Sequence, residues 1–110
     1  MTDDVVRTPS EWKDVGNDAR RRILTYSPAM MVCEVEFGPN GVGPLHHHVH
    51  VQSVYVKSGK FEFDIGGEMH VVAAGDALVI PSNVPHSCRM LEQGTLIDTF
   101  TPAREDFLPA

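Results

Sequence analysis

Four of the six histidines in this chain fall within five residues, at positions 46, 47, 48 and 50. Alternate residues of an extended strand share a face. The positions of that parity are His46, His48, His50 and Gln52. Imidazoles that converge on one point are what a transition-metal site requires, whereas a surface histidine tract needs no such alternation. Because the cluster runs directly into the apolar segment Val54-Tyr55-Val56, the spacing predicts a metal site.

A third nitrogen ligand must come from elsewhere in the chain. His86 follows an apolar segment and a proline-bounded loop, and it opens another predicted strand. His70 is the competing residue, but it comes soon after the Gly66-Gly67 turn, where an exposed strand position is expected. We therefore expect His86 in the site, with His47 and His70 outside it. The role of His50, a neighbour on the same face, stays open.

A second group of chemistry-bearing residues lies near the C-terminus. In the predicted C-terminal strand, Leu96, Asp98 and Phe100 share one face. If that face points inward, Asp98 is a buried carboxyl that needs a partner or a raised pKa. If Ile97 faces the core instead, Asp98 is solvated, and the pattern alone leaves both arrangements open. Arg104, six residues after Asp98, could supply positive charge for an anionic ligand.

The elements that must position these residues are short and rich in β-formers. Nine glycines and eight prolines divide the chain into segments of β-branched and aromatic residues. No segment has a sustained helical period, which favours a sandwich or barrel. Turns at Ser58-Gly59 and Gly66-Gly67 would join three strands into a meander, and a loop is expected over residues 37–44. The predicted strands cover residues 22–26, 30–37, 51–57, 61–65, 69–73, 77–80, 86–91 and 95–100.

The length of 110 residues fits one domain, and the charge balance excludes several function classes. Nine Lys and Arg against fifteen Asp and Glu give a net charge of −6, which argues against binding nucleic acid or an anionic membrane. No apolar run approaches the roughly eighteen residues of a membrane helix. The acidic start Met1–Asp4 is unlike a signal peptide, so a cytoplasmic protein is expected.

Two smaller features complete the inventory of reactive and charged groups. Cys33 and Cys88 are too few for a disulfide framework and too far apart for a CxxC site, so two reduced thiols are expected. The basic triplet Arg20–Arg22 is either a solvated strand edge or a source of inward-pointing charge for an anionic ligand. The sequence leaves both interpretations of the triplet open.

Two segments resemble the motifs of a known family. Residues 41–59 resemble the first cupin motif, a His-x-His pair followed by a carboxylate position, a strand and Gly. Residues 75–86 resemble the second motif, Gly-Asp-x5-Pro ending in His. The resemblance implies an all-β, antiparallel jelly-roll (cupin) β-barrel that holds a metal in its lumen. The implied metal ligands are His46, His48, Gln52 and His86.

Gln52 stands where cupins usually have a glutamate. An amide oxygen is a neutral and weaker donor than a carboxylate, which favours a Lewis-acid or positioning role over a redox iron site. Imidazoles with one amide oxygen suit one divalent transition metal, which would be Ni, Zn, Fe, Mn or Co.

Nearly the whole chain is similar to one subgroup, the KdgF-type cupins of pectin and alginate breakdown. The similar parts are Trp12-x-x-Val-Gly, Arg21-Arg22-x-Leu24, the strand over residues 31–37, the histidine cluster and the tail from Asp98 to Leu108. These cupins convert 4,5-unsaturated uronate monosaccharides to the linear keto form. The resemblance implies the same metal-dependent, isomerase-type ring opening here. The implied catalytic residues are Asp98, Phe100 and Arg104.

Two other uses of the scaffold remain as alternatives: a non-catalytic, metal-containing cupin that binds a sugar or carboxylate, and a metal-dependent dioxygenase. The expected ligand is a small anionic sugar or carboxylate. The resemblance also implies a homodimer, formed through sheet edges or N-terminal strand exchange. Residues 1–20 are expected to form an arm that packs on the barrel or on a partner subunit, and residues 21–110 the cupin domain.

Overall fold

The computed structural model describes residues 6–109, so the start Met1–Asp4 lies outside the described residues. Every strand pair in this part of the chain is antiparallel, and the all-β prediction is confirmed. No helix within residues 6–109 is long and apolar enough to span a membrane. The elements are β1 (Lys13–Gly16), β2 (Ala19–Ser27), β3 (Met30–Phe37), β4 (Val42–His46), β5 (Val51–Ile65), β6 (Glu68–Ala73), β7 (Ala77–Ile80), β8 (His86–Thr101) and the 3-10 helix η1 (Glu105–Phe107).

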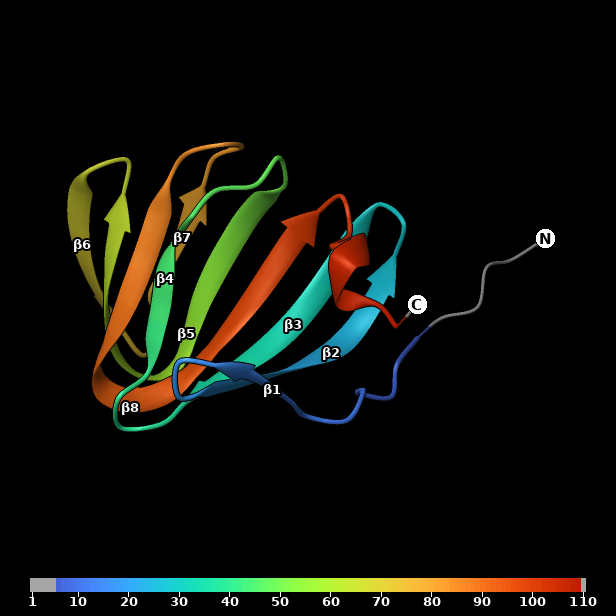
Figure 1. Cartoon of the computed structure of the whole chain (residues 1–110), viewed down its shortest axis with the longest axis horizontal. Helices are drawn as coiled ribbons and strands as arrows, with labels where there is room; N and C mark the ends of the chain where they lie inside the picture. Colours follow the sequence, from blue (N-terminus) through green and yellow to red (C-terminus); the bar gives the residue numbers. More distant parts are fainter. Residues whose placement is uncertain (1–5, 110) are drawn as a thin grey trace.

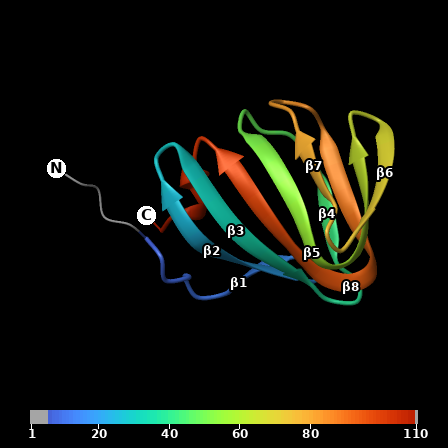
Figure 2. The same cartoon turned by 180° about the vertical axis from the view of Figure 1, so that it is seen from behind.

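The long strands β5 and β8 determine the architecture. They pair with each other from Val51↔Thr101 to Ile65↔His86, with irregular register around residues 56–61. Both strands bend there, as Figure 1 shows for β8 at the lower end of the molecule. One half of the pair carries β4 and β6, and the other half carries β7 and the run β3-β2-β1. Figure 2 shows this second layer from behind. The bend therefore makes two facing layers from one pair of strands.

The predicted turn at Ser58-Gly59 is wrong, because β5 runs through it without reversing. Gly59 has a φ of +83°, and a side chain there would collide with the backbone carbonyls of Glu92 and Gln93 on β8. A side chain at Gly94 would meet the backbone of Ser58 in the same way. The glycines therefore allow the two strands to come close at the bend. The predicted segments 86–91 and 95–100 are likewise one strand, β8.

Among the other sequence predictions, one turn is confirmed and two strands were missed. The Gly66-Gly67 turn is confirmed, since Ile65 pairs with Glu68 across it. Strands β1 and β4 were not predicted, and β4 begins inside the segment expected to be a loop. Both are short and lack a run of β-branched residues, so their pairing partners rather than their own propensities hold them extended. Cys33 and Cys88 are free thiols, as expected.

Two groups of buried apolar side chains form the core, one centred on Phe61 and the other on Met31. Leu96 belongs to the first group and Phe100 to the second, and both lie on one face of β8. Asp98 lies between them and is only 8% exposed. The inward-facing arrangement of Asp98 is therefore confirmed, and the carboxyl interrupts an otherwise apolar wall.

The outer face of the second layer carries a buried ion-pair group. The carboxylate of Glu34 on β3 contacts Arg22 on β2 (Nη2–Oε1, 2.7 Å) and Lys57 on β5 (Nζ–Oε2, 3.0 Å). Hydrogen bonds from these two cations hold the pKa of Glu34 below its ordinary value, although burial of the carboxyl acts in the opposite direction. The group links three strands across β8. Trp12 packs on the same face, under the guanidinium groups of Arg20 and Arg22 (4.2 and 4.6 Å from the ring centroid).

The close approach of β5 and β8 gives a stability prediction. Gly94→Ala should lower the free energy of unfolding by about 3 kcal/mol, because the new methyl group overlaps the Ser58 carbonyl and the backbone must shift. The control is Gly67→Ala, a turn position with a φ of +89° and open space around it, where backbone strain alone should cost about 1 kcal/mol. Urea unfolding measures both. If Gly94→Ala loses no more free energy of unfolding than Gly67→Ala, β5 and β8 do not approach as closely at Gly94 as the structure indicates.

The Glu34 group gives a pH-dependent prediction. Folding lowers the pKa of Glu34, so its ion pairs stabilise the protein fully above the pKa of the unfolded state, which is about 4.3. This stabilisation is lost as the pH falls through the lower pKa of the folded state. Glu34→Gln should cost about 1–3 kcal/mol at pH 7 and progressively less below about pH 4.

The matched control for this prediction is Glu36→Gln. Glu36 pairs with Arg20 in an exposed contact, and such pairs are worth less than about 1 kcal/mol. Unfolding of both variants is measured in urea from pH 3 to pH 8. An equal loss at the two positions, or a loss at Glu34 that does not depend on pH, would show that burial of the Glu34 pair contributes nothing.

Candidate metal centre and active site

Three histidines meet at one end of the cavity between the layers. His46 ends β4, His48 lies in the following loop, and His86 begins β8. Each offers a nitrogen within 4.8 Å of the others, a group that could hold a metal ion. The prediction that His46, His48 and His50 share one strand is wrong, because the strand ends at His46 and the loop carries the next residues. The convergence of His46 and His48 nevertheless holds, and His46 pairs directly with His86 across β4 and β8.

Backbone carbonyls fix the tautomer of all three rings. Nδ1 lies 2.7 Å from the Pro44 carbonyl in His46, 2.9 Å from the His50 carbonyl in His48, and 2.9 Å from the Val84 carbonyl in His86. A carbonyl only accepts, so Nδ1 carries a proton, and in the neutral ring Nε2 has the lone pair. Each ring can therefore ligate a metal through Nε2.

His86 gives the most direct test of whether a metal fits. Its Nε2 is buried and has no hydrogen-bond partner within residues 6–109. Burial lowers the pKa of His86, and the neighbouring His46 and His48 lower it further. A buried lone pair without a donor is costly. A cation bound to the three Nε2 atoms would supply the missing partner, so the residues present fit a metal.

Gln52 on β5 extends the same arrangement. Its side-chain oxygen lies 3.1 Å from Nε2 of His48. When the neutral His48 ring has its proton on Nδ1, both atoms carry lone pairs, so both can ligate one cation. The Gln52 amide also hydrogen-bonds to Asp98, which leaves its oxygen for the histidine side.

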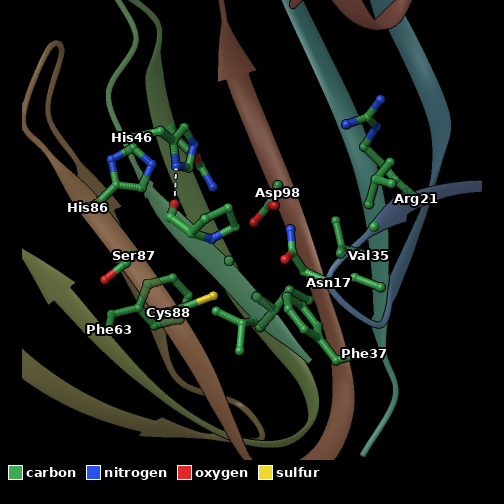
Figure 3. Close-up of a pocket in the computed structure, with 18 of the residues that line it drawn as sticks. Asn17, Arg21, Val35, Phe37, His46, Phe63, His86, Ser87, Cys88 and Asp98 are labelled. Carbon is green, nitrogen blue, oxygen red and sulfur yellow. Dashed lines mark hydrogen bonds between the residues drawn. The ribbon is translucent and has the colours of Figure 1, made fainter. Parts of the chain in front are cut away.

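Asp98 lies across the cavity from the histidines (Figure 3). Burial raises the pKa of Asp98 to about 7, while the hydrogen bond from Gln52 and the charges of Arg21 and Arg104 lower it. Its Oδ1 has no hydrogen-bond partner within the described part of the chain. A carboxyl with these properties can both hold and release a proton near neutral pH.

The C-terminal tail closes the site beside Asp98. Arg104 forms a two-pronged ion pair with Asp106 (Nε–Oδ1 3.1 Å, Nη2–Oδ2 2.9 Å). Its guanidinium carbon lies 5.2 Å from the ring centroid of Phe100, and the Phe100 ring lies edge-on to His48 at 5.8 Å. The tail residues predicted from the sequence therefore lie beside the histidine group.

A cavity of about 290 Å³ connects these groups. Its size is at the lower end for small-molecule pockets, which fits one sugar ring better than a polymer chain. The predicted site residues that line it are His46, Gln52, His86, Asp98, Phe100 and Arg104; His48 is not among the lining residues. Arg21 and Phe107 also line it and were not assigned to the site. Strand alternation could have predicted that Arg21 points to the other face of the strand from Arg20 and Arg22.

The remaining histidines lie outside the triad. The His50 ring is 5.5 Å from that of His48 and 6.4 Å from that of Phe100, at the edge of the site. His70 pairs with Glu68 on β6 at 3.3 Å, and His47 is exposed. The expectation that His47 and His70 lie away from the site agrees with these positions.

Comparisons with known proteins identify the family. The cupin domain profile matches residues 33–98. Over 99 residues the chain is 40% identical to the pectin degradation protein KdgF of Dickeya dadantii, covering 88% of this chain and 90% of that protein. The structure resembles an RmlC-like cupin from Shewanella frigidimarina, with a TM-score of 0.86 and 37% identity over 89% of this chain and 88% of that one. It also resembles KdgF from Halomonas sp., with a TM-score of 0.85 and 36% identity over 90% and 92% of the two chains. The chain therefore belongs to the cupin family and is a homologue of KdgF.

Proposed function

We propose that this protein is a metal-dependent cupin that converts a 4,5-unsaturated uronate monosaccharide to its linear keto form. The observation that carries the proposal is the position of Asp98, a buried carboxyl with a pKa raised to about 7 in the same small cavity as His46 and His86 of the histidine group. The similarity to KdgF, a pectin degradation protein, supports an unsaturated uronate as the substrate class.

The proposed reaction is an isomerisation that moves protons and breaks one bond. The anomeric hydroxyl loses its proton and the ring oxygen gains one while the bond between the anomeric carbon and that oxygen breaks, which gives an aldehyde at C1 and an enol at C5. A proton then adds at C4, the enol hydroxyl loses its proton, and C5 becomes a ketone. No atom is gained or lost, so the protein needs only to hold the ring and to transfer protons.

Asp98 is the residue suited to the proton transfers. Its unpartnered Oδ1 faces the cavity, and a pKa near neutral lets it accept a proton from the anomeric hydroxyl and return one to the opened chain. The apolar wall of Leu96 and Phe100 excludes water from this exchange. Arg104 lines the same cavity beside Phe100, and its ion pair with Asp106 fixes its position.

A divalent metal held by His46, His48, Gln52 and His86 would supply Lewis acidity toward the sugar oxygens. The protein's contribution at this end is orientation. Each Nδ1 is held by a backbone carbonyl, so the three rings are fixed before any ligand arrives.

The catalytic proposal predicts that Asp98→Asn removes the activity. We expect a loss of at least about 100-fold in the rate at which the ultraviolet absorbance of the unsaturated uronate disappears, because an amide cannot exchange the proton. The control is Asp76→Asn, an exposed carboxylate that accepts a hydrogen bond from the Ala73 amide (2.8 Å), which an amide oxygen can also do. If the wild-type rate equals the rate without protein, or if Asp98→Asn keeps the wild-type rate, the catalytic proposal is wrong.

The metal proposal predicts that bound metal depends on the triad. Wild-type protein should contain close to one transition metal per chain, and His48→Ala should lose at least about 10-fold of this content. The control is His70→Ala, which removes an imidazole on β6 that pairs only with Glu68. Elemental analysis of the purified proteins measures the content directly. Equal metal in wild type and His48→Ala would exclude the triad as the metal site.

A further inference from the structure

The basic triplet of β2 is divided by strand alternation. Arg20 and Arg22 point outward and pair with Glu36 and Glu34. Arg21 points to the opposite face and lines the same cavity as His46, Asp98 and Arg104. Neither sequence interpretation of the triplet is complete, because two of the residues are on the outer surface and the third faces inward.

Arg21 is the cation in the cavity that has no counter-ion. It forms no ion pair or side-chain hydrogen bond with any residue between 6 and 109. Arg104, by contrast, uses Nε and Nη2 in its two contacts with Asp106. The charge of Arg104 is therefore largely neutralised within the protein, and the charge of Arg21 is left for another partner.

The ring of Phe107 holds both arginines in place. The guanidinium carbon of Arg21 lies 3.4 Å from the ring centroid, and that of Arg104 lies 4.2 Å from it. Burial and the like charge of Arg104 lower the pKa of Arg21, although the charges of Cys33, Asp106 and Asp98 act in the opposite direction, so ordering this cation here has a cost. An arginine stays protonated in proteins, so loss of the charge does not relieve this cost, whereas a bound anion would.

We propose that Arg21 is the residue that binds the substrate carboxylate, so that it selects uronates over neutral sugars. This inference rests on the proposed function. A guanidinium fork matches a carboxylate in two-pronged geometry. In Figure 3, Asp98 lies between Arg21 on one wall and His46 and His86 on the other. A uronate whose carboxylate meets Arg21 would therefore place its ring beside Asp98, with other oxygens toward the histidines.

The test compares the unsaturated uronate with its methyl ester, which has the same ring but no charge. Ring opening is followed by ultraviolet absorbance for wild type, Arg21→Gln and Arg104→Gln. We expect wild type to prefer the acid over the ester by about 10- to 100-fold in kcat/KM, because a charge-assisted contact is lost in the ester. In Arg21→Gln this preference should fall to less than about 3-fold, through a higher KM for the acid, and metal content should not change.

Arg20→Gln is the matched control, since it removes a neighbouring charge that points away from the cavity and should keep the wild-type preference. Arg21→Lys keeps the charge but not the fork, so it should keep only part of the preference. Full preference in Arg21→Gln or Arg21→Lys would overturn the assignment of Arg21, as would a loss in Arg20→Gln equal to that in Arg21→Gln.

The same measurements distinguish a failure of the Arg21 proposal from a failure of the proposed ring-opening function. If wild type opens neither the acid nor the ester faster than buffer does, the proposed function fails and the role of Arg21 fails with it. If wild type opens the acid and Arg104→Gln alone loses the preference, ring opening stands and Arg21 is not the carboxylate-binding residue.

Discussion

The pairing of β5 with β8 along their full length is the constraint on which the rest of the structure depends. His86 begins β8 and Asp98 and Phe100 lie near its end, so only the bend in that strand brings them to one cavity. The pair Gln52↔Phe100 then places the amide beside the tail residues. Gly59 and Gly94 let the two backbones approach at the bend. The close approach of the two backbones at the bend therefore determines which side chains meet in the cavity.

Electrostatics inside the cavity oppose those of the whole chain. The net charge of −6 repels an anionic sugar at long range, so attraction must be local. Two guanidinium groups share the Phe107 ring, and one carboxylate neutralises Arg104. The surplus positive charge is Arg21. Interactions at such short range in a partly buried site are screened little by salt, whereas the global repulsion is screened strongly.

The sequence predicted the strands better than it predicted how they turn and pair, and the structure brings together three of the histidines that it singled out. The histidine pair and His86 were found because imidazole at that spacing has few structural uses, and Asp98 was left open because alternation does not say which face is inside. Ser58-Gly59 was read as a turn, since a glycine needed for close approach has the same composition as one needed for a reversal. His48 reaches the site from a loop, which strand parity could not anticipate. Arg20, Arg21 and Arg22 are the same residue type, so their type does not indicate which of them faces the cavity. In the structure, Arg20 and Arg22 point outward and pair with glutamates, and Arg21 does not.

Two buried polar atoms in this cavity lack partners within the described chain, Nε2 of His86 and Oδ1 of Asp98, and the half-buried guanidinium of Arg21 forms no ion pair there. In a domain of 110 residues each one subtracts from a small margin of stability, and apolar side chains at these positions would fold more readily. A structural role would have to explain the three separately. The proposed ligands would explain them together, because a cation would satisfy the nitrogen, a carboxylate the arginine, and a sugar hydroxyl the Asp98 oxygen. Their binding would also stabilise the protein, since whatever binds only the folded chain shifts its equilibrium toward folding.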